Sequence, residues 1–314
     1  MVLMAKTKIE WADFSINCIT GCTRVSVGCA NCYAILQSFR CSKMGIDKYD
    51  GVTEKKNKVL DWTGKIRMFP KVLDEPGKRK IPTRYFGNSM SDTFHKDVPF
   101  DFIDRIIQMC LNNPCHEFMI LTKRPENIIK YLDSGHTRVE MLDQCKNLIL
   151  MTSVENQEVA DKRVPSLLSI RDLIPGFPIG LSCEPLLGPI NLIRGQISWC
   201  IVGGESGHRA RPMHPQWVRD IKDQCLGRNV PFFFKQWGEW LPSFQENNLK
   251  PEEVRDNRLK WLRLDYDGNS SESLDDPMRV SDDELFFYRV TKKKAGRVLD
   301  GRTWDELPEL KRDK

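Results

Sequence analysis

Short apolar runs, rich in β-branched and aromatic residues, recur along the central part of the chain, and each of them ends in polar residues. The segments between the runs have apolar residues at helical spacing, as in Phe102–Cys110 and Trp217–Cys225. This alternation predicts parallel strands joined by right-handed helical crossovers. The predicted strands are Thr83–Gly87, Phe118–Leu121, Leu148–Met151, Ile179–Leu181, Trp199–Val202 and Phe232–Phe234, with a further strand near Ile16.

The number of these strand–helix units favours an α/β protein with a complete or partial (β/α) barrel. An open, doubly wound sheet is the alternative, but no glycine-rich phosphate-binding motif follows the first predicted strand. We expect the barrel-like core in residues 1–242 and an acidic, irregular insertion or small subdomain in residues 243–285. The C-terminal segment, residues 286–314, is expected to pack back on the core.

The polar residues that follow the strands are the first candidates for a binding site, because the carboxyl ends of barrel strands carry the chemistry in this architecture. Six such ends in phase would surround one polar cavity with carboxylates, cations, amides and hydroxyls. A single polar strand end is usually a helix cap or a solvated loop. The charged side chains at these ends are Glu155, Glu184, Glu205, Lys123, Arg124 and Lys235.

Composition adds the broad class of the protein. The chain has 314 residues, a net charge of +5 and 40% hydrophobic residues, which indicates a globular protein and excludes a disordered or fibrous one. Residues 243–285 carry a net charge of −6, so the rest of the chain carries +11. A basic body with lysine-rich runs at 55–56, 78–80 and 292–294 suits a polyanion such as nucleic acid, and a solvated surface is the alternative.

The location of the protein is expected to be cytoplasmic. No apolar run approaches the roughly 18 residues that a membrane-spanning helix needs, and the first eleven residues lack the apolar core of a signal peptide. The eleven cysteines should therefore stay reduced, which makes clustered thiols better candidates for metal ligands than for disulfides.

Three thiols are clustered at a C-x6-C-x2-C spacing, at Cys22, Cys29 and Cys32, on a glycine-bearing loop after the first predicted strand. Thiolates are ligands for zinc and for iron–sulfur clusters, and the two-residue gap lets neighbouring thiolates bind one centre. Three protein ligands leave one iron of a 4Fe-4S cluster open. Addition of Cys18 would instead make a four-cysteine site for structural zinc or for a fully ligated cluster.

These cysteines and the motifs around them resemble a phage-associated three-cysteine family of radical-S-adenosylmethionine-like proteins, most of which have no known function. Cys18 departs from the family pattern, which has a proline there. The resemblance runs nearly end to end, through residues 9–13, 20–22, 28–29, 32–34, 89–92, 121–126, 153–156, 183–188, 203–207, 210–212, 235–238, 295–297, 299–302 and 304–305.

The resemblance implies a 4Fe-4S cluster on the three cysteines, S-adenosylmethionine at the open iron and an external electron donor that reduces the cluster. Asn88 and Ser89 would then face the methionine amino group, and Ser153 and Glu155 would contact the ribose. Gly203 and Gly204, followed by Glu205, would let the backbone approach the adenine.

For the substrate we expect a nucleic acid or nucleoside, because the basic balance suits a ligand that bears phosphate. The candidate substrate-binding and catalytic residues are Lys123, Arg124, Glu184, Lys235 and Gln236. Two alternatives stay open. The charged residues could form internal pairs, Glu184 with Lys235 and Arg124 with Glu155, or the chain could be a non-catalytic nucleic-acid-binding protein stabilised by zinc or by an iron–sulfur cluster.

Overall fold

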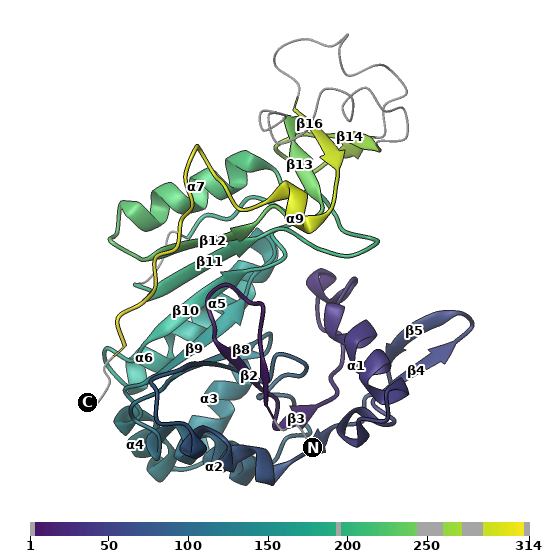
Figure 1. Cartoon of the computed structure of the whole chain (residues 1–314). Coiled ribbons are helices and arrows are strands. Elements are labelled where there is room, and N and C mark those ends of the chain that lie inside the picture. Colours follow the sequence, from purple (N-terminus) through teal and green to yellow (C-terminus); the bar gives the residue numbers. More distant parts are fainter. Residues whose placement is uncertain (1–3, 193–195, 244–259, 272–284, 311–314) are drawn as a thin grey trace. The chain divides into compact units, whose positions relative to one another are not determined.

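The structure of the protein is a computed structural model that describes residues 4–192, 196–243, 260–271 and 285–310 (Figure 1). Its main sheet has the strand order β1-β2-β7-β8-β9-β10-β11-β12. These strands are β1 (Met4–Lys6), β2 (Phe14–Ile16), β7 (Arg84–Gly87), β8 (Glu117–Thr122), β9 (Leu148–Ser153), β10 (Ile179–Cys183), β11 (Trp199–Gly203) and β12 (Phe232–Gln236).

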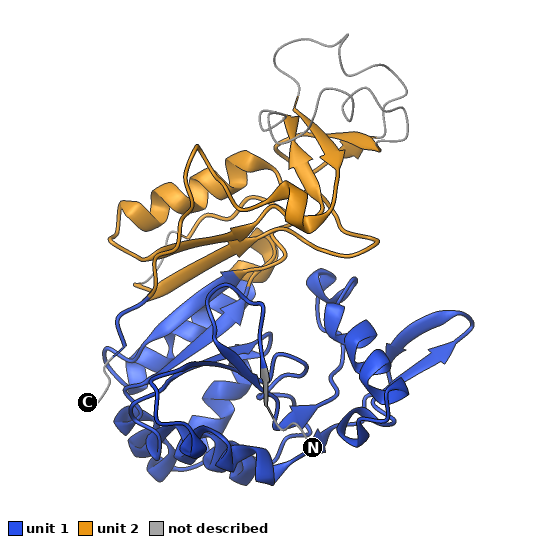
Figure 2. Cartoon of the chain, viewed as in Figure 1, with its two compact units in different colours: residues 1–153, 161–182, 308–314 blue, residues 154–160, 183–307 orange. Residues whose placement is uncertain are grey.

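Two compact units divide the chain (Figure 2). Unit 1 comprises residues 1–153, 161–182 and 308–314, and unit 2 comprises residues 154–160 and 183–307. The core boundaries predicted at residues 242 and 285 stay a prediction. Most of the predicted acidic insertion, at residues 244–259 and 272–284, lies outside the described residues.

Unit 1 is built on parallel pairing between β2 and β7, β7 and β8, β8 and β9, and β9 and β10, with β1 antiparallel to β2 at the edge. All four residues of the run Leu148–Met151 are at most 1% exposed. A parallel strand covered on both faces needs such a continuous apolar run. The other elements of unit 1 are β3 (Ile19–Thr20), α1 (Tyr33–Lys43), β4 (Thr53–Lys56), β5 (Val59–Trp62), β6 (Arg67–Met68), α2 (Phe100–Leu111), α3 (Pro125–Asp133), α4 (His136–Gln144) and α6 (Ile170–Leu173).

Helices connect the parallel strands of unit 1, and α2 shows why they form. Its residues Phe102, Ile103, Ile106, Ile107 and Cys110 are buried, and they recur at helical spacing along one side of the helix. Helices α2, α3 and α4 pack against one another on the outer side of the sheet (Figure 1). The α5 helix (Gln157–Leu168) begins in unit 2 and ends in unit 1.

Unit 2 contains the parallel pair β11 and β12, joined through α7 (Pro215–Leu226). Trp217, Val218, Ile221 and Cys225 form the buried side of α7, as the helical spacing predicts. A four-stranded sheet has the order β13-β16-β14-β15, with β13 (Trp240–Pro242), β14 (Trp261–Leu264), β15 (Ser270–Ser271) and β16 (Phe286–Arg289). The helix α9 (Lys292–Ala295) follows, and the carbonyl of Trp304 accepts a hydrogen bond of 2.9 Å from the Phe234 N–H of β12.

The prediction of an α/β protein with a partial (β/α) barrel is confirmed. The six predicted apolar runs match strands β7 to β12, except that β7 begins one residue after Thr83, and the two predicted amphipathic segments lie in α2 and α7. None of the helices in the described part of the chain is long and apolar enough to cross a membrane.

Candidate functional site

The cysteine loop, residues 21–32, lies between β3 and α1 in unit 1. It begins at Gly21, whose φ of +88° and close approach to the Lys65 carbonyl leave no room for a side chain, because an added Cβ would lie 2.0 Å from that oxygen. Gly21 also forms a parallel bridge with Ser91, just after β7. The loop therefore starts beside the carboxyl end of a sheet strand, where barrel chemistry is expected.

The three thiols of the loop have different surroundings. Cys22 Sγ donates to the Thr23 carbonyl at 3.4 Å and lies 3.8 Å from Arg124 Nη1, while Cys29 Sγ lies 3.9 Å from the Ser26 hydroxyl. Burial raises the pKa of Cys22 to about 12, and it also raises the pKa of Cys32, on which the Lys123 charge acts in the opposite direction. Burial therefore favours the neutral thiol at both positions.

An arginine holds the middle of the loop. Arg24 Nη1 donates to the carbonyls of Cys29 and Ala30 at 2.7 and 2.6 Å, and its Nε lies 2.9 and 3.0 Å from the two carboxylate oxygens of Asp61 in β5. The loop is thus connected to the β4–β5 hairpin. Its end is held by Tyr33, the first residue of α1, whose hydroxyl donates to the Ser89 carbonyl at 2.6 Å.

Arg124 and Asp92 form a buried ion pair of 2.7 Å beside the start of the loop, with side chains only 7% and 6% exposed. The second terminal nitrogen of Arg124 donates to the carbonyl and the hydroxyl of Thr23, at 2.9 and 2.8 Å. The prediction placed Arg124 in the site but did not identify Asp92 as its partner. The position of Asp92 in the polar run after β7 was the one sequence feature that could have identified it as a site residue.

Cys18, the candidate fourth ligand, lies outside this loop, before β3. It is 2% exposed, and its thiol donates to Asn88 Oδ1 at 3.4 Å. Burial raises the pKa of Cys18 to about 12. The Cys18 thiol therefore contacts Asn88 in the interior of unit 1, and no described contact joins it to Cys22, Cys29 or Cys32.

Asn88 and Ser89, predicted to face a cofactor, follow β7. The Asn88 side chain is buried, accepts from the Ile19 N–H at 3.0 Å and donates to Thr93 Oγ1 at 2.8 Å, so both ends of its amide have partners within unit 1. The Ser89 hydroxyl donates to Asn17 Oδ1 at 3.2 Å. Asn88 has a φ of +56°, in the left-handed region that asparagine tolerates better than most residues.

Ser153, at the end of β9, is 2% exposed, and its carbonyl accepts from Arg163 Nη1 at 2.8 Å. Glu155 lies in unit 2 and is completely buried, with its carbonyl accepting from the Leu187 N–H at 2.7 Å. The ribose contacts expected of Ser153 and Glu155 stay a prediction.

Unit 2 brings together most of the other predicted residues. Lys235 Nζ lies 2.7 Å from Glu184 Oε1, the internal pair that the sequence left open as an alternative to substrate binding, and both side chains are less than one-fifth exposed. An added Cβ on Gly203 would lie 2.7 Å from the same Glu184 oxygen. Gln236 Nε2 donates to the Gly204 carbonyl at 3.3 Å, and its buried Oε1 has no hydrogen-bond partner among the described residues.

Glu205 has Arg211 as an ion-pair partner. Both of its carboxylate oxygens accept from Arg211, with Arg211 Nε at 2.8 Å from Oε2 and Nη2 at 2.7 Å from Oε1, and the Arg211 N–H donates at 2.9 Å. Glu205 is 6% exposed. The negative charge of Glu205 is therefore balanced by Arg211, which lies in the segment after β11.

The structure thus groups the predicted residues in two sets. In unit 1, Cys22 contacts Arg124, and the Lys123 charge acts on Cys32. In unit 2, Glu184 contacts Lys235 and Gln236 contacts Gly204. Within the parts of the chain that the structure describes, no group of three or more His, Cys, Asp or Glu side chains is arranged as a metal site.

Comparison with known proteins gives one family and a set of distant structures. Spore photoproduct lyase with bound AdoMet and dinucleoside spore photoproduct is 14% identical to the chain over 93% of this chain and 72% of that one, with a TM-score of 0.44. Spore photoproduct lyase complexed with dinucleoside spore photoproduct is 13% identical over 94% and 73%, with a TM-score of 0.45. No curated protein matches. The model of a family described as protein of unknown function (DUF5131) matches residues 6–308, and the chain belongs to that family.

Proposed function

We propose that this chain is a radical-S-adenosylmethionine-like enzyme, with a 4Fe-4S cluster on Cys22, Cys29 and Cys32 and a nucleic acid or nucleoside as substrate. The observation that carries the proposal is the cysteine loop at the carboxyl end of the unit 1 sheet, with Arg124 Nη1 at 3.8 Å from the Cys22 sulfur. An N–H donor beside a sulfur ligand is a usual partner of a cluster thiolate.

The donor set fits such a cluster. All three candidate ligands are soft thiols, and three of them leave one iron for an external ligand. A cluster on three thiolates adds negative charge in a buried place, where Arg124 and Lys123 are the cations that oppose it. When bound, the cluster and S-adenosylmethionine would supply one-electron cleavage of the sulfonium carbon–sulfur bond.

The residues of the chain then have distinct proposed roles. Asn88 holds the start of β3, the strand that precedes the loop, because its amide is satisfied by Ile19, Cys18 and Thr93. Ser89 is next to Asn88 and hydrogen-bonded through its carbonyl to Tyr33, so it is the better candidate for a cofactor contact from this strand end. In unit 2, Gln236 is the candidate for a substrate contact, because its Oε1 is a buried acceptor without a partner in the described chain.

The test is anaerobic reconstitution with iron and sulfide, followed by metal analysis, visible absorbance and electron paramagnetic resonance. We expect about four iron and four sulfide per chain, as a 4Fe-4S cluster requires, and release of 5′-deoxyadenosine when the reduced protein receives S-adenosylmethionine. One zinc with no iron would contradict the proposal and favour the metal-stabilised binding protein. A cluster with no product and no spectral change on addition of the cofactor would remove the enzymatic part.

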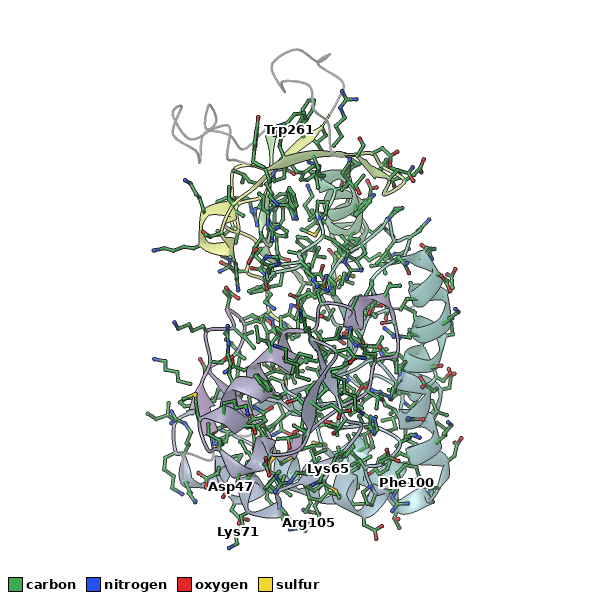
Figure 3. The ribbon with its side chains drawn as sticks, turned by 90° about the vertical axis from the view of Figure 1, so that its right-hand side faces the viewer. Asp47, Lys65, Lys71, Phe100, Arg105 and Trp261 are labelled. Atoms are coloured by element: carbon green, nitrogen blue, oxygen red, sulfur yellow. The ribbon has the colours of Figure 1, made fainter. Side chains whose placement is uncertain are left out.

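The β4–β5 hairpin supports a polyanionic substrate. It extends from unit 1 beside α1 (Figure 1), and the end of β4 and the turn after it carry exposed Lys55, Lys56 and Lys58. Lys65 and Lys71 add exposed cations in the same unit (Figure 3). Because Asp61 of this hairpin is bound to Arg24, the exposed lysines are connected to the cysteine loop through two side chains.

Charge reversal of Lys55, Lys56 and Lys58 to glutamate is expected to weaken binding of a labelled oligonucleotide and to lower the slope of log K against log salt by about two to three, since each lost phosphate contact removes about one. Titration at several salt concentrations measures both effects. The same three-charge reversal at Lys292, Lys293 and Lys294 is the matched control. Equal losses in the two variants would show a general charge effect and contradict a role for the hairpin.

A further inference from the structure

Asp92 has more hydrogen-bond donors around it than a simple ion pair needs. Its Oδ1 accepts from Thr122 Oγ1 at 2.6 Å and from the Phe94 N–H at 3.0 Å. Its Oδ2 accepts from the Lys123 N–H at 3.1 Å and from Arg124 Nη1 at 2.7 Å. Four donors fill the four lone-pair directions of the carboxylate, so Asp92 has a single orientation.

Arg124 transmits this fixed orientation to the cysteine loop. One terminal nitrogen is shared between Asp92 and the Cys22 sulfur, and the other donates twice to Thr23, the residue after Cys22. The Thr23 hydroxyl is also 2.9 Å from His95 Nε2. A planar guanidinium with these partners cannot rotate without breaking several bonds at once.

Burial of the Asp92–Arg124 pair also costs desolvation free energy, which the attraction between the two charges does not always offset. Both side chains are more than nine-tenths buried, and a buried ion pair is often no more stabilising than apolar residues of the same size. Here one of the donors points at a sulfur of the candidate cluster rather than at a second carboxylate. Asp92 thus fixes the position of a cation, Arg124, beside a predicted metal ligand, Cys22.

We infer that Asp92 and Arg124 are positioning residues for Cys22, and that the Arg124 N–H and charge raise the reduction potential of the group that the three thiols hold. This inference rests on the proposed function. A hydrogen bond and a positive charge at a cluster sulfur stabilise the reduced, more negative state more than the oxidised one. Asp92 acts through Arg124, because its oxygens set where the guanidinium lies. The inference thus places Arg124 beside the cluster, whereas the sequence analysis predicted it to bind the substrate.

The experiment compares reconstituted wild-type protein with Arg124→Met, Arg124→Lys, Asp92→Asn and Thr23→Val. Arg138→Met is the control, because Arg138 forms an ion pair of similar length but less burial in unit 1, with Asp104 at 2.9 Å, between α4 and α2. The readouts are iron per chain, the electron paramagnetic resonance spectrum of the reduced protein and the midpoint potential from a dye-mediated titration.

We expect iron-loaded Arg124→Met to have a more negative midpoint potential and an altered spectrum, with Arg124→Lys between it and the wild type. Asp92→Asn should shift the potential in the same direction, and Arg138→Met should leave it unchanged. If Arg124→Met does not fold, the midpoint potentials of Thr23→Val and Arg124→Lys test the inference instead. Both variants keep a cation beside Cys22 but lose some of the hydrogen bonds that fix its position. Wild-type potentials in these iron-loaded variants would overturn this inference alone, whereas a wild-type chain that takes up no iron would overturn the proposed function together with it.

Discussion

Replacement of Cys22, Cys29 or Cys32 by alanine is expected to abolish iron uptake on anaerobic reconstitution, whereas Cys18→Ala keeps it at the wild-type level. A cluster with three protein ligands cannot lose one and stay bound firmly, because no fourth thiol replaces it. Cys18 is 2% exposed and donates to Asn88, so its sulfur is already used inside unit 1. Iron and sulfide analysis of each variant, with visible absorbance, measures the result.

Cys41→Ala is the matched control for this series. Cys41 lies in α1, close in sequence to the loop, and is a partly buried thiol that packs with Cys32 against the small core around Tyr49 and Val52. Its loss should cost some stability and no iron. If Cys18→Ala also lost the cluster while its fold was intact, the site would have four cysteine ligands, and the open iron of the proposal would not exist.

The barrel strands were predictable from the sequence because burial on both faces makes a parallel strand apolar throughout, as in Leu148–Met151. The β4–β5 hairpin was not predicted, since its strands Thr53–Lys56 and Val59–Trp62 mix charged and apolar residues and are only partly buried. Its turn has positive φ at both Asn57 and Lys58. Lysine is rare in that conformation, so the usual glycine signal for such a turn is missing.

The residues of the site were easier to predict than their partners. Polar strand ends identify Arg124, but its partner Asp92 lies thirty-two residues earlier, on the neighbouring strand end. The sequence pattern around either residue cannot predict this ion pair, because the pair forms only when β7 and β8 are neighbours in the sheet. The pair of Glu205 with Arg211 was not predicted either, although only six residues separate the two side chains.

The glycine pair Gly203 and Gly204 can be explained either by a bound ligand or by packing within the protein. The resemblance implied that these glycines let backbone approach an adenine. In unit 2, the space where a Cβ would lie is occupied at both positions by the protein itself, by the Glu184 carboxylate beside Gly203 and by the Trp237 carbonyl beside Gly204. A side chain at Gly204 would therefore clash with backbone, and one at Gly203 would displace the Glu184 carboxylate, whether or not a ligand also approaches.

Gly204→Ala is expected to destabilise unit 2 severely, by more than about 4 kcal/mol, because the new Cβ meets backbone that cannot move aside. It would lie 2.0 Å from the Trp237 oxygen and 2.6 Å from the carbonyl carbon. The Gly204 N–H also donates to the Gln236 carbonyl at 2.9 Å, so retreat of either segment breaks the connection between the ends of β11 and β12. Urea unfolding followed by tryptophan fluorescence measures the loss.

Gly203→Ala is the matched neighbour for that experiment, and it separates packing from ligand binding. Its Cβ would meet the far end of the Glu184 side chain at 2.7 Å, which can shift, although the shift disturbs the pair with Lys235. We expect a smaller cost, about 1–3 kcal/mol. A Gly204→Ala protein as stable as the wild type would contradict the close approach to Trp237. A stable Gly203→Ala protein that binds S-adenosylmethionine normally would assign Gly203 to the packing of Glu184, whereas loss of that binding with the fold intact would support the adenine contact.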